Sequence, residues 1–376
     1  MHNTVLSPIE WWKSHRNALL SLAHQQTPVY VYHADTIRSQ IITLKKIKTV
    51  KRFFYSMKAN DCQDVLRVIE QEGLGFECVS RGELEYLEEC FPQLSPDRIL
   101  FTPNFCAKTD YEYARDRGVW ITVDNEYPLR HWPHSFQGAR LLVRLDIGEG
   151  KGHHDYVKTA GGEAKFGIEA SQWSEICALI SQHHLNVVGL HAHAGSGIED
   201  VNHWASVLRA LEEFAKALPT ITVLNMGGGL GVGTPALNME AIDHSLKNTA
   251  YEIWLEPGRF IVADSGVLLL RVTQLKYKKG VNFVGVDGGM NVLIRPALYQ
   301  AYHDIINLSR FNNPLNFRAH IVGPICESAD VLGKDRLLAT PEVGDIFLMT
   351  QTGAYGAVMS SHYNRQVAAA EVVLSI

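Results

Sequence analysis

The order of its hydrophobic segments is the feature that most constrains how this chain can fold. Short runs rich in β-branched and aromatic residues alternate with longer segments whose apolar residues recur three and four positions apart, the period of a helix. Eight such units are the number that closes into a β/α barrel, and an open, doubly wound sheet is the competing architecture. The runs that we predict as strands are Arg52–Ser56, Gly75–Val79, Arg98–Phe101, Trp120–Val123, Leu141–Asp146, Val187–His191, Val223–Met226 and Ile253–Leu255.

After about Ala263 the rhythm changes, because most of the predicted strands follow one another without a long helix between them. These later strands are Val267–Tyr277, Val281–Val286, Arg318–Val322, Asp345–Thr350 and Glu371–Leu374. The pattern predicts an α/β fold, with a (β/α)8 TIM barrel over residues 28–264 and a mainly β, sandwich- or barrel-like domain over residues 265–376. We group residues 1–27 with the second domain, although the pattern alone leaves their packing open.

Composition narrows the classes of function. The chain has 35 Lys and Arg against 40 Asp and Glu, a net charge of −5, and we identify no basic block, which argues against a nucleic-acid partner. No apolar run approaches the ~18–20 residues that span a bilayer, and the N-terminal residues lack the features of a signal peptide. Six cysteines without paired spacing favour the reducing cytoplasm.

Barrel enzymes carry their chemistry where the strands end, and four of the predicted strand ends are unusual. Lys58 follows the first strand, the sixth ends in His191 with His193 two residues later, the glycine run Gly227–Gly231 follows the seventh, and Glu256 follows the eighth. A glycine run lets backbone N–H groups converge on a phosphate, although it also forms tight turns. Lys58 is either a surface lysine or an amine that forms a Schiff base. Lysine, phosphate cradle and carboxylate together match the needs of pyridoxal 5′-phosphate (PLP).

The two histidines leave three interpretations open. Residues two apart on a strand face the same side, so His191 and His193 could bind a metal ion, as in barrel hydrolases. Alternatively, one imidazole stacks on a flat cofactor. The third possibility is a histidine that only packs in the barrel mouth.

Taken together in order, the motifs resemble a known family. They are Tyr55-Ser56-Met57-Lys58-Ala59-Asn60, His191-Ala192-His193-Ala194-Gly195-Ser196, Gly227-Gly228-Gly229-Leu230-Gly231, Glu256-Pro257-Gly258-Arg259 and Gly323-Pro324-Ile325-Cys326-Glu327-Ser328-Ala329-Asp330. This set resembles the alanine-racemase-fold, group IV PLP-dependent decarboxylases, and among them most of all the diaminopimelate decarboxylase family. The likeness runs from about Thr27 to Glu371.

The resemblance implies a role for each matching residue. Lys58 would join the cofactor covalently, His193 would stack on its pyridine ring, and Glu256 would pair with the ring nitrogen. The remaining cofactor contacts would come from Ser196, Gly228, Gly229, Arg259 and Tyr355. The substrate would be bound by Arg259, Arg295, Tyr299, Glu327 and Tyr355. Cys326 would donate the proton that takes the place of carbon dioxide.

The resemblance also implies an assembly and a reaction. The assembly is a homodimer in which Cys326 and Glu327 reach the partner's active site and the mainly β domain contributes to the substrate site and the interface. The implied reaction converts meso-2,6-diaminopimelate to L-lysine and carbon dioxide. The alternatives are a same-fold decarboxylase of carboxynorspermidine, arginine or a carrier-linked amino acid, a non-catalytic regulator, and a metal-dependent barrel hydrolase. One departure from the family pattern is Glu77, which stands where aspartate is commoner.

Overall fold

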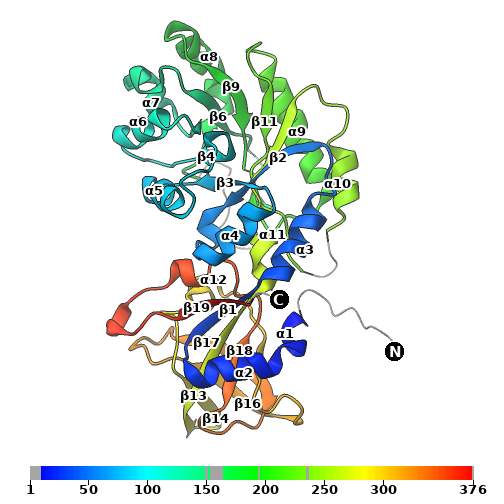
Figure 1. Ribbon diagram of the computed structural model, residues 1–376, viewed down its shortest axis with the longest axis vertical. Coiled ribbons are helices and arrows are strands. Elements are labelled where there is room, and N and C mark those ends of the chain that lie inside the picture. Colours follow the sequence, from blue (N-terminus) through cyan, green and yellow to red (C-terminus); the bar gives the residue numbers. More distant parts are fainter. Residues whose placement is uncertain (1–9, 149–150, 153–163, 194, 234–236, 375–376) are drawn as a thin grey trace. The chain divides into compact units, whose positions relative to one another are not determined.

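The computed structural model describes residues 10–148, 151–152, 164–193, 195–233 and 237–374, and it divides the chain into two compact units (Figure 1). The barrel unit consists of Ile41–Lys58 and Ile69–Phe260. The sheet unit consists of Met1–Gln40, Ala59–Val68 and Ile261–Ile376. The two units are groups of residues that lie close in space. The domain limits 28–264 and 265–376 stay a prediction.

The barrel unit is built on eight parallel strands. Each strand pairs with its neighbour, and β12 pairs with β2, so that the sheet closes on itself. The strands are β2 (Val50–Ser56), β3 (Gly75–Cys78), β4 (Ile99–Phe101), β5 (Trp120–Val123), β6 (Arg140–Asp146), β9 (Val187–His191), β11 (Val223–Asn225) and β12 (Glu252–Leu255). The predicted barrel is confirmed, and the open sheet is excluded by the pairing of β12 with β2.

Amphipathic helices alternate with these strands. They include α5 (Arg81–Cys90), α6 (Lys108–Asp116), α7 (Glu126–His131), α8 (Trp173–Gln182), α9 (Val201–Ala215) and α10 (Met239–Ser245), while α3 (Ala34–Leu44), α4 (Gln63–Gln71) and α11 (Arg259–Val262) have residues in both units. Helix α9 shows why they form: it buries Trp204, Val207, Leu208 and Leu211 at helical spacing. The side chain of Asp200 caps its first turn by accepting from the N–H of Asn202.

The interior of the barrel is packed with apolar side chains. One buried cluster consists of Phe54, Leu100, Trp120, Leu142, Val223 and Trp254. The rings of Trp120 and Trp254 meet edge to face, with their centroids 4.9 Å apart. Because these side chains fill the interior, the barrel is a packed core and not a pore. Burial of each large side chain stabilises it by about 2–3 kcal/mol.

The sheet unit contains one mixed, mainly antiparallel sheet. Its strands are β1 (Val29–His33), β13 (Gly266–Lys278), β14 (Val281–Val286), β15 (Ile305–Asn307), β16 (Leu315–Val322), β17 (Val331–Ala339), β18 (Ile346–Met349) and β19 (Ala370–Leu374). The five strands predicted after Ala263 are confirmed, whereas β1, β15 and β17 were not predicted. Strand β1 pairs with β13 and β19, and α12 (Arg295–Tyr299) is inserted between β14 and β15.

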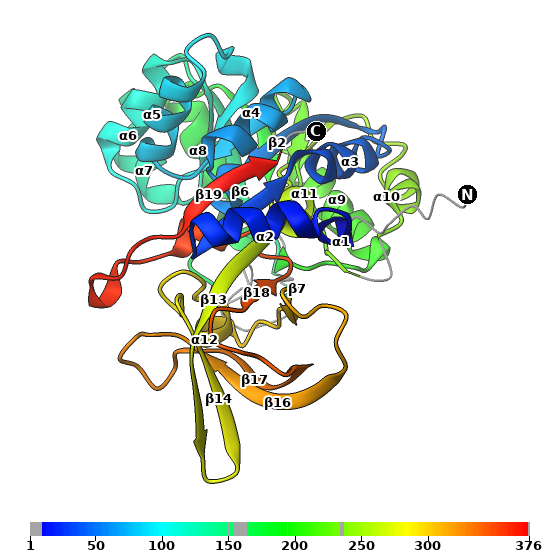
Figure 2. The same cartoon turned by 60° about the horizontal axis from the view of Figure 1, so that its bottom comes forward.

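The N-terminal helices pack within the sheet unit, an arrangement that the sequence pattern left open. Helices α1 (Trp11–Ser14) and α2 (Arg16–Gln25) pack against β13 and its neighbours (Figure 2). Trp11, Trp12 and Leu19 share a buried cluster with Leu269 and Leu348. The indole N–H of Trp11 also donates to the carbonyl oxygen of Asp264, at 3.1 Å. These residues therefore complete the core of the sheet unit.

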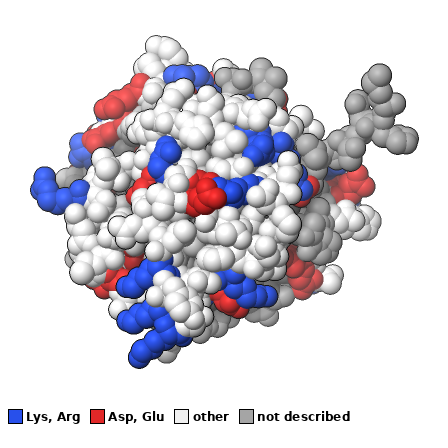
Figure 3. All heavy atoms as spheres, turned by 90° about the horizontal axis from the view of Figure 1, so that it is seen from below, with Lys and Arg blue, Asp and Glu red and all other residues white. Residues whose placement is uncertain are grey.

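The surface is mixed in charge. Figure 3 shows Lys, Arg, Asp and Glu side chains interspersed over a face that is mainly uncharged. Most of the exposed large apolar side chains among the described residues belong to the sheet unit, and four of them, Leu275, Tyr277, Leu315 and Leu337, lie on its strands. In the described ranges, no helix has both the length and the apolar character required to cross a membrane.

Candidate active site

The carboxyl ends of the barrel strands bring together the residues singled out in the sequence. Lys58 lies in a short 3-10 turn, Met57–Ala59, directly after β2. His193 follows β9, and Glu256 follows β12. Because these strands are parallel, their carboxyl ends lie at the same mouth of the barrel. A residue to which the sequence analysis gave no role, Glu77 near the end of β3, joins them there.

Glu77 forms an ion pair with Lys58. The Lys58 Nζ atom lies 2.5 Å from Glu77 Oε2, and the Glu77 side chain is buried. Burial raises the pKa of Glu77, the Lys58 ammonium lowers it in part, and Glu256 raises it further. A carboxylate at the end of the strand next to that of Lys58 was the signal that could have identified this residue.

Glu256 has a different environment. Its Oε1 atom accepts a hydrogen bond from Asn225 Nδ2 at 2.8 Å and lies 3.3 Å from Nε2 of the buried His191. Burial by itself would raise the pKa of Glu256, but His191 and the Lys58 ammonium outweigh burial and lower that pKa to about 2. Glu256 is therefore ionised at neutral pH, as a carboxylate facing a pyridinium nitrogen must be.

His193 has a fixed ring and a low pKa. Its Nδ1 atom accepts the backbone N–H of Gly228 at 3.0 Å, so this nitrogen is the unprotonated one. Burial lowers the pKa of His193 to about 3, and the cations Arg144 and Lys58 act in the same direction. His191, by contrast, faces Glu256. Among the described residues, no three His, Cys, Asp or Glu side chains are grouped so that they could hold a metal ion.

The glycine run after β11 is shaped by close approach of other backbone segments. A Cβ atom on Gly228 would lie 2.3 Å from the carbonyl oxygen of Glu256, and one on Gly229 would lie 2.4 Å from that of Gly195. Gly229 also has φ +106°, which favours glycine. Ser196 lies beside this run in β10 (Gly195–Ser196), and the N–H of Ile198 donates to the carbonyl of Gly229. The backbone here leaves no space for a side chain.

A buried arginine in the barrel was missed by the sequence analysis. Arg144 is on β6, and its Nη1 atom lies 3.2 Å from Asp124 Oδ1. The guanidinium lies over the ring of Phe166. Burial raises the pKa of Asp124, and the charge of Arg144 lowers it in part. Asn104 donates to the other oxygen of Asp124. Because Arg144 also interacts electrostatically with Glu256 and Glu77, it is part of the same charged group.

The sheet unit holds the proposed substrate residues of α12. Arg295 and Tyr299 are four residues apart on this helix, so their side chains lie on one face. Arg295 Nη1 lies 3.2 Å from Nε2 of His303, whose Nδ1 lies 2.9 Å from the carbonyl oxygen of Thr350. The Thr350 carbonyl requires the proton on Nδ1, which leaves Nε2 to accept from Arg295. His303 thus orients the guanidinium.

The other predicted residues of the sheet unit lie in two loops. Cys326 and Glu327 are exposed in the turn between β16 and β17. Tyr355 is half-buried with φ 56°, and its N–H donates to the carbonyl of Ala59 at 2.8 Å. Ala59 is the residue after Lys58, so this hydrogen bond ties Tyr355 to the chain beside the lysine. Arg259, the first residue of α11, belongs to the barrel unit.

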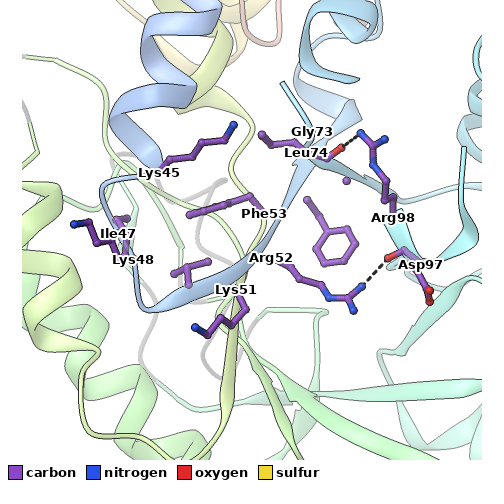
Figure 4. Close-up of a pocket in the computed structure, with 13 residues that line it drawn as sticks. Lys45, Ile47, Lys48, Lys51, Arg52, Phe53, Gly73, Leu74, Asp97 and Arg98 are labelled. Carbon is purple, nitrogen blue, oxygen red and sulfur yellow. Dashed lines mark hydrogen bonds between the residues drawn. The ribbon is translucent and has the colours of Figure 1, made fainter. Parts of the chain in front are cut away.

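A cavity of about 530 Å³ lies at the opposite, amino-terminal ends of β2, β3 and β4 (Figure 4). Its cationic lining residues are Lys45, Lys48, Lys51, Arg52 and Arg98. Residues 45–52 carry five Lys and Arg side chains, so the expectation of no basic block is wrong for this segment. Lys45 and Arg98 already donate to the carbonyls of Glu72 and Leu74, and this cavity is separate from the strand ends that carry Lys58.

Comparison with known proteins identifies the class. Residues 34–263 match the family described as pyridoxal-dependent decarboxylase, pyridoxal binding domain. The diaminopimelate decarboxylase of Methanothermobacter thermautotrophicus is 34% identical, covering 93% of this chain and 86% of that protein, and the Escherichia coli K12 enzyme is 34% identical, covering 92% and 88%. The chain belongs to the pyridoxal-dependent decarboxylase family, and its relatives place it with the diaminopimelate decarboxylases. It is a PLP-dependent carboxy-lyase.

Solved structures agree with this assignment. The Helicobacter pylori diaminopimelate decarboxylase complexed with L-lysine is 28% identical, with a TM-score of 0.84 over 93% of this chain and 92% of that one. The Vibrio vulnificus lysine/ornithine decarboxylase, at 21% identity and a TM-score of 0.83 over 95% of this chain and 98% of that one, shares the fold.

The barrel mouth fits PLP on its own geometry. It offers an amine at the end of a strand, an ionised buried carboxylate, a neutral imidazole and a glycine run whose Cβ positions are filled by backbone. An aldehyde coenzyme with a basic ring nitrogen and a phosphate needs these groups. Lys58, Glu256, His193 and the loop from Gly228 to Gly229 therefore form a donor set appropriate to PLP.

Proposed function

We propose that the chain decarboxylates meso-2,6-diaminopimelate to L-lysine and that the residues named above act in this reaction. The observation that carries the proposal is that the Lys58 amine and the ionised Glu256 carboxylate lie at the same barrel mouth, after β2 and β12. The family match over residues 34–263 supports the cofactor chemistry. The relatives named for diaminopimelate support the substrate.

The barrel residues hold the cofactor. Bound PLP supplies a protonated ring that accepts the electron pair left on the α-carbon when carbon dioxide departs. Lys58 would hold the coenzyme through its amine. Glu256 would keep the proton on the ring nitrogen, and His193 would present a neutral ring face. The phosphate would be held by Ser196, Gly228, Gly229, Arg259 and Tyr355.

The substrate residues match a molecule with an amino-acid group at each end. Arg259 and Arg295 provide forked donors for the distal carboxylate, helped by the hydroxyl groups of Tyr299 and Tyr355. Glu327 provides a countercharge for the distal ammonium. His303 supports this assignment, because its contact with Arg295 holds the guanidinium in one orientation. The substrate of a diamine-forming decarboxylase has no distal carboxylate for these arginines to bind.

Cys326 completes the reaction. Loss of carbon dioxide breaks the bond between the α-carbon and its carboxylate, and the electron pair of that bond must be taken by a proton. The Cys326 thiol donates this proton and becomes a thiolate, which regains a proton from water before the next turnover. Cys326 is exposed, so it is accessible to a substrate.

The proposed assembly is a homodimer with shared active sites. Exposed apolar side chains on the sheet unit support it, since Tyr277 is 71% and Leu315 63% exposed and a second subunit would cover such side chains. The exposed positions of Cys326 and Glu327 are suited to reaching a second subunit. We also propose a cytoplasmic location, because all six cysteines are free thiols.

The central experiment incubates the purified enzyme and PLP with meso-diaminopimelate and measures carbon dioxide and lysine. The expected result is equal release of both, with little turnover of ornithine, arginine or carboxynorspermidine. Arg295→Gln should raise KM for diaminopimelate about 100-fold, because a charge-assisted contact to the distal carboxylate is lost. Release of carbon dioxide from ornithine or arginine in preference to diaminopimelate would contradict the substrate assignment.

The dimer is tested by mixing two inactive variants. Lys58→Ala and Cys326→Ala subunits are unfolded and refolded together, or co-expressed with different tags. If each site takes Lys58 from one subunit and Cys326 from the other, half of the dimers are mixed and each has one intact site. About a quarter of the wild-type activity should return. No recovery in a verified mixed dimer would place both residues in one subunit's site.

A further inference from the structure

The Cys326–Glu327 pair is held by two side chains that come from a distant segment. The backbone N–H of Cys326 donates to Asn364 Oδ1 at 2.8 Å, and the two residues are 38 positions apart in the chain. The hydroxyl of Tyr363 donates to Glu327 Oε1 at 2.7 Å. Two neighbouring residues thus contact the two neighbouring residues of the pair.

The turn that carries the pair is held at its base by Asp330 and at its outer side by Asn364 and Tyr363. Inside it, the buried Asp330 carboxylate accepts from the N–H groups of Ile325, at 2.7 Å, and Met290, at 2.6 Å. These bonds hold the inner face of the turn. Cys326 and Glu327 lie on the exposed outer face, where Asn364 and Tyr363 supply hydrogen bonds from outside the turn.

The segment that supplies these bonds has its own backbone requirement. Asn364 has φ 53° and Arg365 has φ 57°, both in the left-handed region. Asparagine adopts this region more readily than most residues with a side chain, for which it costs about 1–2 kcal/mol. Just before it, the N–H of Ser361 donates to the carbonyl of Asn291 at 2.8 Å. The segment is therefore anchored to the loop that contains Met290, whose N–H donates to the Asp330 carboxylate of the turn.

We propose that Asn364 and Tyr363 are positioning residues of the reaction: Asn364 holds the Cys326 peptide so that the thiol reaches the α-carbon, and Tyr363 orients the Glu327 carboxylate toward the substrate ammonium. This inference rests on the proposed roles of Cys326 and Glu327. The two hydrogen bonds act on different steps, since one concerns proton delivery and the other concerns substrate binding. Their loss has separable kinetic consequences.

The Asn364 contact is tested with a pair of variants. Asn364→Gly keeps the left-handed backbone but removes the acceptor, whereas Asn364→Asp keeps both. For the holoenzyme with meso-diaminopimelate, we expect Asn364→Gly to lower kcat about 5- to 10-fold, the effect of losing one hydrogen bond, and to release more carbon dioxide than lysine. Asn364→Asp should stay closer to wild type in both measurements. The matched control is Asn248→Gly, an exposed asparagine with φ 69° in the barrel unit, which should change neither.

The Tyr363 contact is tested with Tyr363→Phe, which removes only the hydroxyl. We expect KM for diaminopimelate to rise about 5- to 10-fold while kcat and the ratio of carbon dioxide to lysine stay near the wild-type values. The visible spectrum of bound PLP serves as a control for an intact barrel. A fall in kcat with unchanged KM would overturn the assignment of Tyr363.

Cys326→Ala separates failure of this inference from failure of the proposed function. If Cys326→Ala changes the ratio of carbon dioxide to lysine but Asn364→Gly leaves both kcat and that ratio unchanged, the positioning role of Asn364 is wrong and the proton donor stands. If Cys326→Ala itself leaves the ratio and kcat unchanged, Cys326 is not the proton donor, and the inference falls with it.

Discussion

The ammonium nitrogen of Lys58 lies 2.5 Å from Oε2 of Glu77, a side chain that is only 1% exposed. A second buried carboxylate, Glu256, stands at the same barrel mouth, yet the two have opposite pKa shifts: burial raises the pKa of Glu77, whereas that of Glu256 falls to about 2. Environments that shift the pKa values of two carboxylates in opposite directions commonly give the two groups separate tasks. Glu77 faces the lysine amine, and Glu256 provides the fixed negative charge.

Glu77→Gln should shift the pH dependence of cofactor capture. The substitution keeps the shape of the side chain but removes the negative charge that stabilises the Lys58 ammonium, so the amine becomes neutral at lower pH. The midpoint of PLP binding, followed by visible absorbance, should therefore move to lower pH. Glu85→Gln, which alters an exposed ion pair with Arg81, is the matched control. A midpoint that stays in place or rises would show that Glu77 does not set the charge of Lys58.

Gly228→Ala should weaken PLP binding without unfolding the barrel. The new methyl group would lie 2.3 Å from the carbonyl oxygen of Glu256, so the loop must move away from the strand end. We expect Kd for PLP, measured by fluorescence titration, to rise at least about 10-fold, the equivalent of about 1.4 kcal/mol. Gly82→Ala is the control, because its methyl group would meet only Ser80 Oγ, at 3.8 Å, and should leave Kd unchanged. Equal effects of the two substitutions would rule out a cradle at Gly228.

Arg144→Met should destabilise the barrel, because it leaves the buried Asp124 carboxylate without its cation. Removal of one partner of a buried pair typically costs about 3–5 kcal/mol, whereas replacement of both partners is much less costly. We therefore expect the double variant Arg144→Met/Asp124→Asn to recover much of the loss. Chemical denaturation of the wild type, Arg144→Met, Asp124→Asn and the double variant measures the coupling. If the double variant is as unstable as Arg144→Met, the ion pair is not the cause.

His193 makes stability depend on pH in a defined window. Its pKa is about 3 in the folded chain, against an ordinary value of 6.5, so unfolding takes up a proton below pH 6.5. The stability that comes from keeping the ring neutral is complete above pH 6.5 and is lost as the pH falls toward 3. His193→Asn should therefore lose about 1–2 kcal/mol less stability than wild type between about pH 7 and pH 5. Thermal unfolding of both proteins at the two pH values tests this, and identical losses would contradict it.

The barrel could be predicted because its information is local. Each of the eight strands is a short apolar run followed by an amphipathic helix, and the observed strand limits agree with the predicted ones to within two residues. Strand β17 was missed because Val331–Ala339 contains Gly333, Lys334 and Asp335, which have low strand propensity. It is a strand because β16 supplies its hydrogen-bond partners. The same reason applies to β1, whose partners β13 and β19 come from far along the chain.

The sequence by itself determined the kinds of chemical group present: a lysine, a carboxylate, histidines and glycines, each placed after a predicted strand. Tertiary structure decided how these groups pair. It placed Glu77 rather than Glu256 against the Lys58 ammonium, set the Nδ1 atom of His193 against Gly228, and brought Asn364 to Cys326. Periodicity depends on neighbours in the chain, whereas partner choice and burial depend on contacts between distant residues. Those contacts exist only once the strands have closed into a barrel and the loops have packed.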